Sequence, residues 1–125
     1  MRRNQELIMT IDSIPLLDLT TINELKDIVE EGIFEIYHEY DITVSDTLSK
    51  ISDNINNTDK LAQLSHTIKG SSGSIGLERM RAISETIEHG LRDNEDIDID
   101  TLVSQLTITF SETIKALKDS DLIKQ

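Results

Sequence analysis

The chain has 125 residues, a length typical of one domain rather than of an enzyme with separate cofactor and substrate lobes. Its formal net charge of -12 repels nucleic-acid phosphates and anionic lipid headgroups, and its lack of cysteine excludes disulfides and thiolate zinc sites. No apolar stretch approaches the roughly 20 residues that span a bilayer, and no secretory signal opens the chain, so we expect a cytoplasmic protein that binds neither nucleic acid nor membranes.

The first half of the chain predicts helices, because apolar residues recur at steps of three and four and no alternating strand pattern occurs. For residues 1–18 we predict a short helix or an arm that packs across the body of the protein. The run from Thr21 to Glu24 matches a capping box, which predicts a short helix that starts near Thr21 and ends at Gly32. A longer helix is expected over residues 33–55.

Three more helices are predicted in the second half. Thr58 is expected to cap the first of them, and Gly76 to end it. Residues 77–91 repeat the apolar spacing, and an acidic loop separates them from a last helix that Asp98 or Asp100 caps. Amphipathic helices joined by short turns can bury their apolar faces only against each other, so we predict an all-α, antiparallel bundle.

The segment from Ser65 to Gly76 is the most informative part of the chain. On a helical projection its apolar residues form one face, and His66 points almost directly away from that face, so His66 should be exposed to water. Gly70 and Gly73 share the outer face with His66, and Lys69 lies beside it. Two glycines within a helix cost about 1 kcal/mol each relative to alanine, so we interpret them as a bare patch that lets another protein approach.

The chemistry predicted for this patch is phosphoryl transfer. Free imidazole has a pKa of about 6.5 and is a competent nucleophile at neutral pH without an adjacent general base. The ammonium of Lys69 would neutralise an anion placed on His66. Residues 60–92 carry a net charge of +2 and the remainder of the chain -14, which makes this area relatively cationic. A surface of ordinary mixed charge gives such a local excess equally often, so the charge alone does not distinguish a binding site from an ordinary surface.

The run His66-Thr67-Ile68-Lys69-Gly70-Ser71-Ser72-Gly73-Ser74-Ile75-Gly76 resembles the signature of histidine phosphotransfer (HPt) domains. That signature is His-x-[Leu/Ile/Phe]-Lys-Gly-Ser-[Ser/Ala]-x-x-[Ile/Leu/Met]-Gly, and every slot matches. In addition, Ile87-Glu88 stands where the family commonly has a Leu-Glu pair. Ser65 and Ser84 depart from the alanine and the cysteine or other small residue that are usual at their positions.

The resemblance covers residues 19 to about 118 and implies an up-down-up-down four-helix bundle with an additional N-terminal helix. It leaves residues 1–18 as an arm or short helix and residues 119–125 as a tail. It also implies a phosphorelay intermediate, in which His66 accepts a phosphoryl group from a receiver-domain aspartate and passes it to the aspartate of a response regulator.

The expected partners are receiver domains of hybrid sensor histidine kinases and of response regulators. Lys69 would stabilise the charge of the transferred group, and the partner would dock on four residues: Gly70, Gly73, Gln63 and Ser74. We expect a monomeric phosphocarrier without an ATP site or kinase activity, with no metal or cofactor on this chain and Mg²⁺ on the partner receiver. The alternative function is a non-catalytic helical bundle that binds and inhibits a receiver or kinase without being phosphorylated.

Other functional assignments in this chain are weaker. The lysine precedes the glycines, which excludes a nucleotide-binding P-loop. His38 and His89 are expected to be ordinary solvated residues. Ser71 and Ser72 are expected to cap or pack locally rather than to react.

Overall fold

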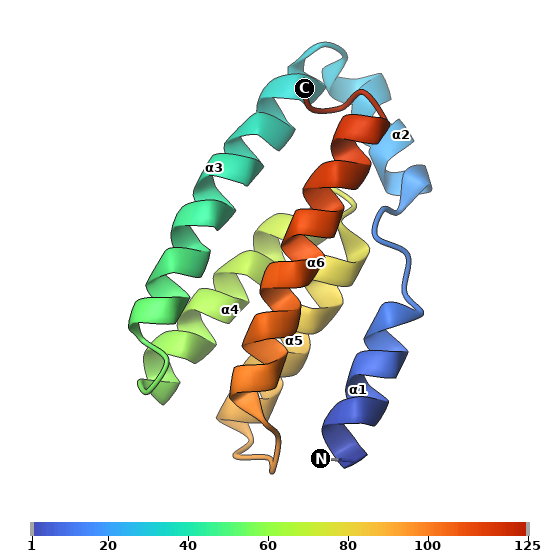
Figure 1. The fold of residues 1–125 in the computed structure, drawn as a ribbon. Helices are drawn as coiled ribbons and strands as arrows, with labels where there is room; N and C mark the ends of the chain where they lie inside the picture. The colour runs from blue at the N-terminus through green and yellow to red at the C-terminus, as the bar shows by residue number, and fades with distance from the viewer. Residues whose placement is uncertain (1, 125) are drawn as a thin grey trace.

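The computed structural model describes residues 2–124, and the side chains from residue 5 onward. Within that range it consists of six α-helices without strands: α1 (Arg2–Asp12), α2 (Leu19–Val29), α3 (Gly32–Asp53), α4 (Thr58–Gly73), α5 (Glu78–Arg92) and α6 (Ile99–Asp119). Figure 1 shows α3 running down the molecule, α4 up, α5 down and α6 up, with α2 at the upper end. The predicted all-α helical bundle is confirmed.

Side-chain caps fix the starts of three helices. Asp18, Asn57 and Asp98 immediately precede α2, α4 and α6, and each accepts a hydrogen bond from the backbone N–H three residues later. The prediction for Asp98 is therefore confirmed. Two other predicted starts are wrong: Thr21 lies inside α2, with its hydroxyl 2.9 Å from the Asp18 carboxylate, and Thr58 is the first residue of α4 rather than its cap.

Two predicted helix ends also differ from the structure. The break between α2 and α3 falls at Glu30, which has a φ of 52°, and Gly32 begins α3 instead of ending α2. Helix α4 ends at Gly73, three residues before the predicted breaker Gly76. Gly76 instead closes the turn between α4 and α5.

Gly76 also attaches α2 to the bundle. Its φ of +79° lies in the left-handed region, and its carbonyl accepts a 2.8 Å hydrogen bond from the Asp18 N–H. A Cβ built at this position would lie 2.8 Å from Cγ1 of Ile22, which is only 2 % exposed. The turn therefore requires glycine both for its backbone conformation and for the close approach of α2.

Replacing Gly76 by alanine is expected to destabilise the fold. The left-handed backbone costs a residue with a Cβ about 1–2 kcal/mol, and with the clash against Ile22 we expect a total loss of about 2–4 kcal/mol. The measurement is urea unfolding followed by circular dichroism. The matched control is Gly70→Ala, in a helix and in open space, which should gain about 0.5–1 kcal/mol. A Gly76→Ala variant as stable as the natural chain would contradict this account.

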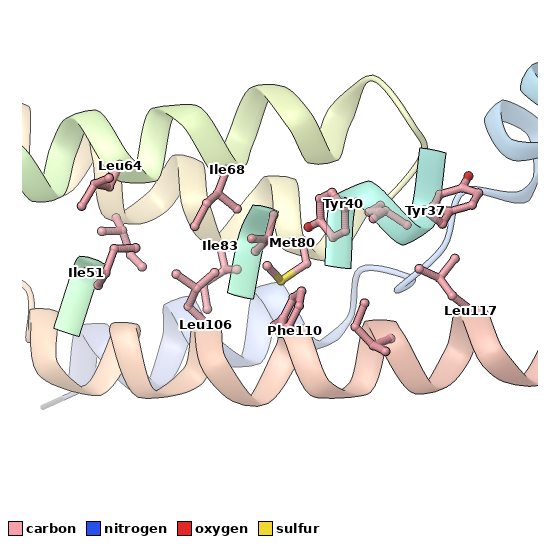
Figure 2. Packing of buried hydrophobic residues seen from close by; sticks show 14 of the residues in the cluster. Tyr37, Tyr40, Ile51, Leu64, Ile68, Met80, Ile83, Leu106, Phe110 and Leu117 are labelled. Atoms are coloured by element: carbon pink, nitrogen blue, oxygen red, sulfur yellow. The ribbon is translucent and has the colours of Figure 1, made fainter. Parts of the chain in front are cut away.

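The core is aliphatic, as the composition indicates. Figure 2 shows aliphatic side chains of α4, α5 and α6 pointing into the space between the helices. Of the four aromatic residues, Tyr37, Tyr40 and Phe110 are buried and Phe34 is 40 % exposed. The rings of Tyr40 and Phe110 lie 6.2 Å apart between α3 and α6, within the range of favourable aromatic pairs.

The two buried tyrosines connect α3 to the C-terminal end of α4. The Tyr37 hydroxyl donates to the Ile75 carbonyl at 2.8 Å, and the Tyr40 hydroxyl lies 2.7 Å from the buried Ser72 hydroxyl. Together with the buried apolar residues of α4, these contacts hold the inner face of the helix against the bundle.

The segments that flank the bundle pack against it. Helix α1 contacts α5 and α6 and contributes the buried Ile11. The Arg79 Nε donates a 2.6 Å hydrogen bond to the Ile14 carbonyl and so holds the segment after α1. At the other end, Leu122 and Ile123 are buried, so the predicted tail contributes to the core.

Candidate functional site

His66 lies on the outer face of α4, and its predicted exposure is confirmed. Its side chain is 60 % exposed, whereas its neighbours Ser65 and Ile68 are buried against the bundle. His38 and His89 are also exposed, as expected for solvated residues. Their surroundings differ from those of His66, which faces a charged side chain from α5.

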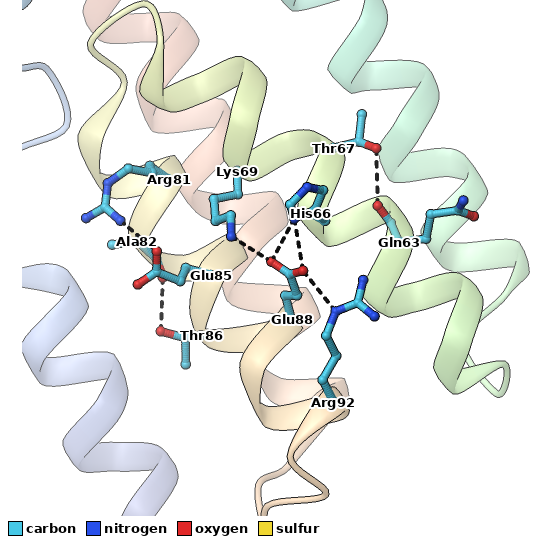
Figure 3. A network of polar contacts seen from close by, with 10 residues as sticks. All are labelled: Gln63, His66, Thr67, Lys69, Arg81, Ala82, Glu85, Thr86, Glu88 and Arg92. Carbon is cyan, nitrogen blue, oxygen red and sulfur yellow. Dashed lines mark hydrogen bonds and ion pairs between the residues drawn. The ribbon is translucent and has the colours of Figure 1, made fainter.

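That side chain is Glu88, whose carboxylate connects three other residues (Figure 3). One oxygen of Glu88 lies 2.9 Å from Nδ1 of His66. The Lys69 Nζ and the Arg92 Nε each lie 2.9 Å from a carboxylate oxygen. The side chain of Glu88 is only 6 % exposed, so these contacts form beneath the surface, with the imidazole ring above them.

Glu88 is ionised in this environment. Burial alone would raise the pKa of its carboxyl group, but hydrogen bonds from Lys69, Arg92 and His66 outweigh that effect and lower the pKa to about 2. An ionised carboxylate only accepts hydrogen bonds, so the proton between it and His66 belongs to Nδ1. In the neutral ring the free lone pair is then on the other nitrogen, Nε2, which points away from Glu88, on the exposed side of the ring.

Sequence reasoning missed Glu88 as a functional residue and gave Lys69 a simpler role. We expected an imidazole that acts without an acid–base neighbour, and the structure places a carboxylate on its inner nitrogen. We also expected the ammonium of Lys69 to neutralise an anion placed on His66, and the structure pairs it with Glu88 as well, with its side chain 23 % exposed. The only signal for Glu88 in the sequence is its place in the Leu-Glu pair of the resemblance.

The two glycines of the predicted bare patch differ in how open the surface around them is. Outside its own stretch of helix, a Cβ built at Gly70 would meet no heavy atom of the described residues within 4 Å, so the surface there is open, as predicted. A Cβ at Gly73 would lie 3.2 Å from Cδ of Arg81, whose aliphatic stem covers this glycine in part. Arg81 is held in place by Glu78 and Glu85, at 2.7 and 3.2 Å. The patch is thus open at Gly70 and bordered by an arginine at Gly73.

The other predicted docking residues are also at the surface. Gln63, one turn before His66 on α4, and Ser74, the residue after α4, are both exposed. The Ser71 hydroxyl donates to the Thr67 carbonyl at 3.0 Å, an internal helix contact. With Ser72 bonded to a buried tyrosine, both serines pack locally, as predicted.

Two general features of the described residues bear on function. Among residues 5–124, whose side chains are described, no group of three or more His, Asp or Glu is placed to hold a metal ion. No helix among the described residues is both long enough and apolar enough to cross a bilayer.

Comparison with known proteins gives one family and one similar fold. The model of the Hpt domain family matches residues 35–119, which extend from α3 to the end of α6 and include His66, Lys69 and Glu88. The fold is similar to the crystal structure of histidine-containing phosphotransfer protein B (HptB) from Pseudomonas aeruginosa PAO1. The TM-score is 0.79 at 18 % sequence identity, covering 85 % of this chain and 94 % of that chain. No curated protein matches this sequence.

Proposed function

Because this chain belongs to the Hpt domain family, we propose that it is a cytoplasmic phosphorelay intermediate between two receiver domains. His66 accepts a phosphoryl group from the aspartate of a hybrid sensor kinase and passes it to the aspartate of a response regulator. One observation carries this proposal: the exposed ring of His66 is bound through Nδ1 to an ionised carboxylate, so its Nε2 is left as an open nucleophile.

The accepting step needs no movement of a proton on this chain. The lone pair of Nε2 attacks the phosphorus of the phospho-aspartate, the new N–P bond forms, and the P–O bond to the aspartate breaks, so that the aspartate leaves as a carboxylate. Nδ1 keeps its hydrogen throughout. The positive charge that develops on the ring is stabilised by the Glu88 carboxylate, 2.9 Å from Nδ1.

The donating step uses the same contact in reverse. A carboxylate oxygen of the second receiver attacks the phosphorus, and the N–P bond breaks. Because Nδ1 is already protonated, His66 leaves as a neutral imidazole with its hydrogen bond to Glu88 intact. A phosphocarrier must both accept and donate the phosphoryl group, and a proton fixed on Nδ1 serves both steps.

The charges around His66 favour an anionic group. Lys69 and Arg92 bring two positive charges to the single negative charge of Glu88, so the cluster carries a surplus of one positive charge while the ring is neutral. We propose that this surplus, with Lys69 as its main contributor, stabilises the transferred phosphoryl group. The Mg²⁺ of the reaction is assigned to the receiver.

The test is transfer from a phosphorylated receiver. The protein is incubated with a hybrid kinase and radiolabelled ATP, and we expect a label that is labile in acid, stable in alkali, and located on His66 by mass spectrometry. Tight binding of the receiver without any label would overturn this proposal and favour the non-catalytic alternative. Label on an aspartate or serine would also overturn it.

A bulky side chain in the bare patch should block docking. Gly70→Arg adds a long cation where the structure leaves open space, in a helix that arginine suits well. We expect the same helicity and at least a tenfold rise in the KM for receiver transfer, on the order of the cost of a few lost contacts. Labelling by phosphoramidate, a small donor, should be unchanged. Unaltered transfer from Gly70→Arg would contradict the assigned docking surface.

A further inference from the structure

A polar recess of about 590 Å³ opens beside His66. It lies between the first turns of α4 and the end of α5, and it is lined by Asn57, Asp59, Lys60, Gln63 and Arg92. Figure 3 shows Gln63 and Arg92 on the same side of His66. Lys60 precedes His66 by six residues, about 9 Å along the helix axis at 1.5 Å per residue.

The recess contains cationic groups whose hydrogen-bonding capacity is unused. Lys60 is exposed, and no ion pair or side-chain hydrogen bond to its ammonium occurs within residues 5–124. Arg92 binds Glu88 through Nε, and over the same residues its two terminal nitrogens have no partner. Asp59 is the single carboxylate among the lining residues. Counted together with the cluster at His66, the cations Lys60, Lys69 and Arg92 outnumber the carboxylates Asp59 and Glu88 by one, on a chain whose net charge is -12.

We propose that this recess receives the acidic rim of the magnesium site on a docked receiver domain, and that Lys60 is a specificity-determining contact. The inference rests on the proposed function, which places Mg²⁺ on the partner. Proteins hold Mg²⁺ through carboxylates, so a receiver that supplies this ion presents acidic groups close to its phospho-aspartate. When that phosphorus meets Nε2 of His66, the recess offers these acidic groups Lys60, an ammonium that no carboxylate of residues 5–124 pairs.

The opposite end of the same face has the opposite charge. Arg81 lies there between Glu78 and Glu85, which leaves one negative charge in excess. Figure 3 shows Arg81 and Glu85 on the other side of His66 from Arg92. An acidic rim is attracted at one end of the face and repelled at the other, so the charges select a single orientation of the partner.

The experiment compares two charge reversals, Lys60→Glu and Lys115→Glu. Lys115 is an exposed lysine on α6, next to the groove between α6 and α3, and both variants have the same net charge. Each variant is phosphorylated on His66 with phosphoramidate, and transfer to a panel of purified receiver domains is followed with Mg²⁺ at several salt concentrations. Circular dichroism and thermal unfolding establish that both variants are folded.

We expect Lys60→Glu to lower kcat/KM about tenfold at low salt, mainly through KM, as for a charge at the rim of an interface. The dependence on salt should weaken as well, and Lys60→Gln should give an intermediate value. Lys115→Glu should change kcat/KM less than about twofold, because its charge is remote and screened. Labelling by phosphoramidate should be the same for all variants.

The possible results separate this inference from the proposed function. Equal transfer by Lys60→Glu and Lys115→Glu would overturn the role of the recess and leave phosphotransfer by the natural chain intact. A loss of phosphoramidate labelling in Lys60→Glu would also overturn it, since that reaction needs no docking. If the natural chain passed its phosphoryl group to no receiver, the proposed function would fail, and this inference with it.

Discussion

Replacing His66 by glutamine is expected to abolish phosphoryl acceptance and to leave the fold unchanged. The Nε2 lone pair is the nucleophile in the proposed step, and an amide nitrogen has no comparable lone pair. The side chain is 60 % exposed and contributes little to the core, so its loss should not alter the bundle. The measurement is radiolabel from a phosphorylated receiver and from phosphoramidate, together with the midpoint of thermal unfolding.

The other two histidines provide matched controls for this variant. His38 on α3 and His89 on α5 are exposed imidazoles that lack a hydrogen-bonded carboxylate in the described part of the chain. His38→Gln and His89→Gln should label at the rate of the natural chain. Residual acid-labile label on His66→Gln would mean that another histidine accepts the group, contrary to the assignment of His66.

The amino-acid sequence predicts the helices because the apolar face of each helix is encoded by local spacing. It does not predict their starts equally well, because several neighbouring residues are able to cap a helix. Thr21 and Thr58 both suit a cap by type, yet Asp18 and Asn57 supply the side-chain oxygens that bind the free N–H groups. The choice depends on where the preceding chain turns, which local spacing does not show.

In the candidate site too, the sequence predicts the features set within one helix but not the contacts between helices. The exposure of His66 and the open surface at Gly70 follow from positions on a single helix, so a projection of α4 predicts both. The contact between His66 and Glu88 joins residues 22 positions apart, on two helices. It depends on the register of α5 against α4, which the packing of the whole bundle sets. The partial cover of Gly73 by Arg81 was missed for the same reason.

The structure also gives a physical reason for a glycine at position 70. A glycine in a helix costs stability, and outside its own stretch of helix no atom of the described residues approaches Gly70 closely enough to require one. At Gly76, by contrast, the left-handed backbone and the contact with Ile22 explain the glycine within the fold itself. Nothing among the described residues compensates for the stability lost at Gly70, as we expect of a surface on which a partner docks.

Removing the carboxylate of Glu88 is expected to slow transfer in both directions while leaving the nucleophile in place. In Glu88→Ala, Nδ1 of His66 has no acceptor, so the proton is free to move to Nε2 and occupy the attacking lone pair. The positive charge that develops on the ring also loses its partner. We expect a loss of about 10²-fold in rate, the lower end of the range for a positioned proton-holding group. Phosphoramidate labelling should slow equally, because the defect lies in the ring and not in docking.

Two measurements distinguish this role from a purely structural one. Nitrogen-15 NMR separates protonated from unprotonated ring nitrogens. In the neutral ring of the natural chain it should find the proton on Nδ1. In Glu88→Ala it should find a mixture of two tautomers, one with the proton on Nδ1 and one with the proton on Nε2. Glu88→Asp, which keeps a carboxylate on a shorter side chain, should recover part of the rate. An unchanged rate or an unchanged tautomer in Glu88→Ala would show that Glu88 does not control the ring.

The pH dependence of stability gives an independent check on the same carboxylate. Its pKa is lowered from the ordinary 4.5 to about 2 in the folded protein. A group with a lowered pKa stabilises the fold at pH values above its ordinary pKa, and this contribution is lost as the pH falls toward the folded pKa. The difference in unfolding free energy between the natural chain and Glu88→Ala should therefore be constant near neutral pH and shrink between pH 4.5 and about 2. A difference that instead grows in acid would mean that Lys69, Arg92 and His66 do not hold Glu88 in its ionised form.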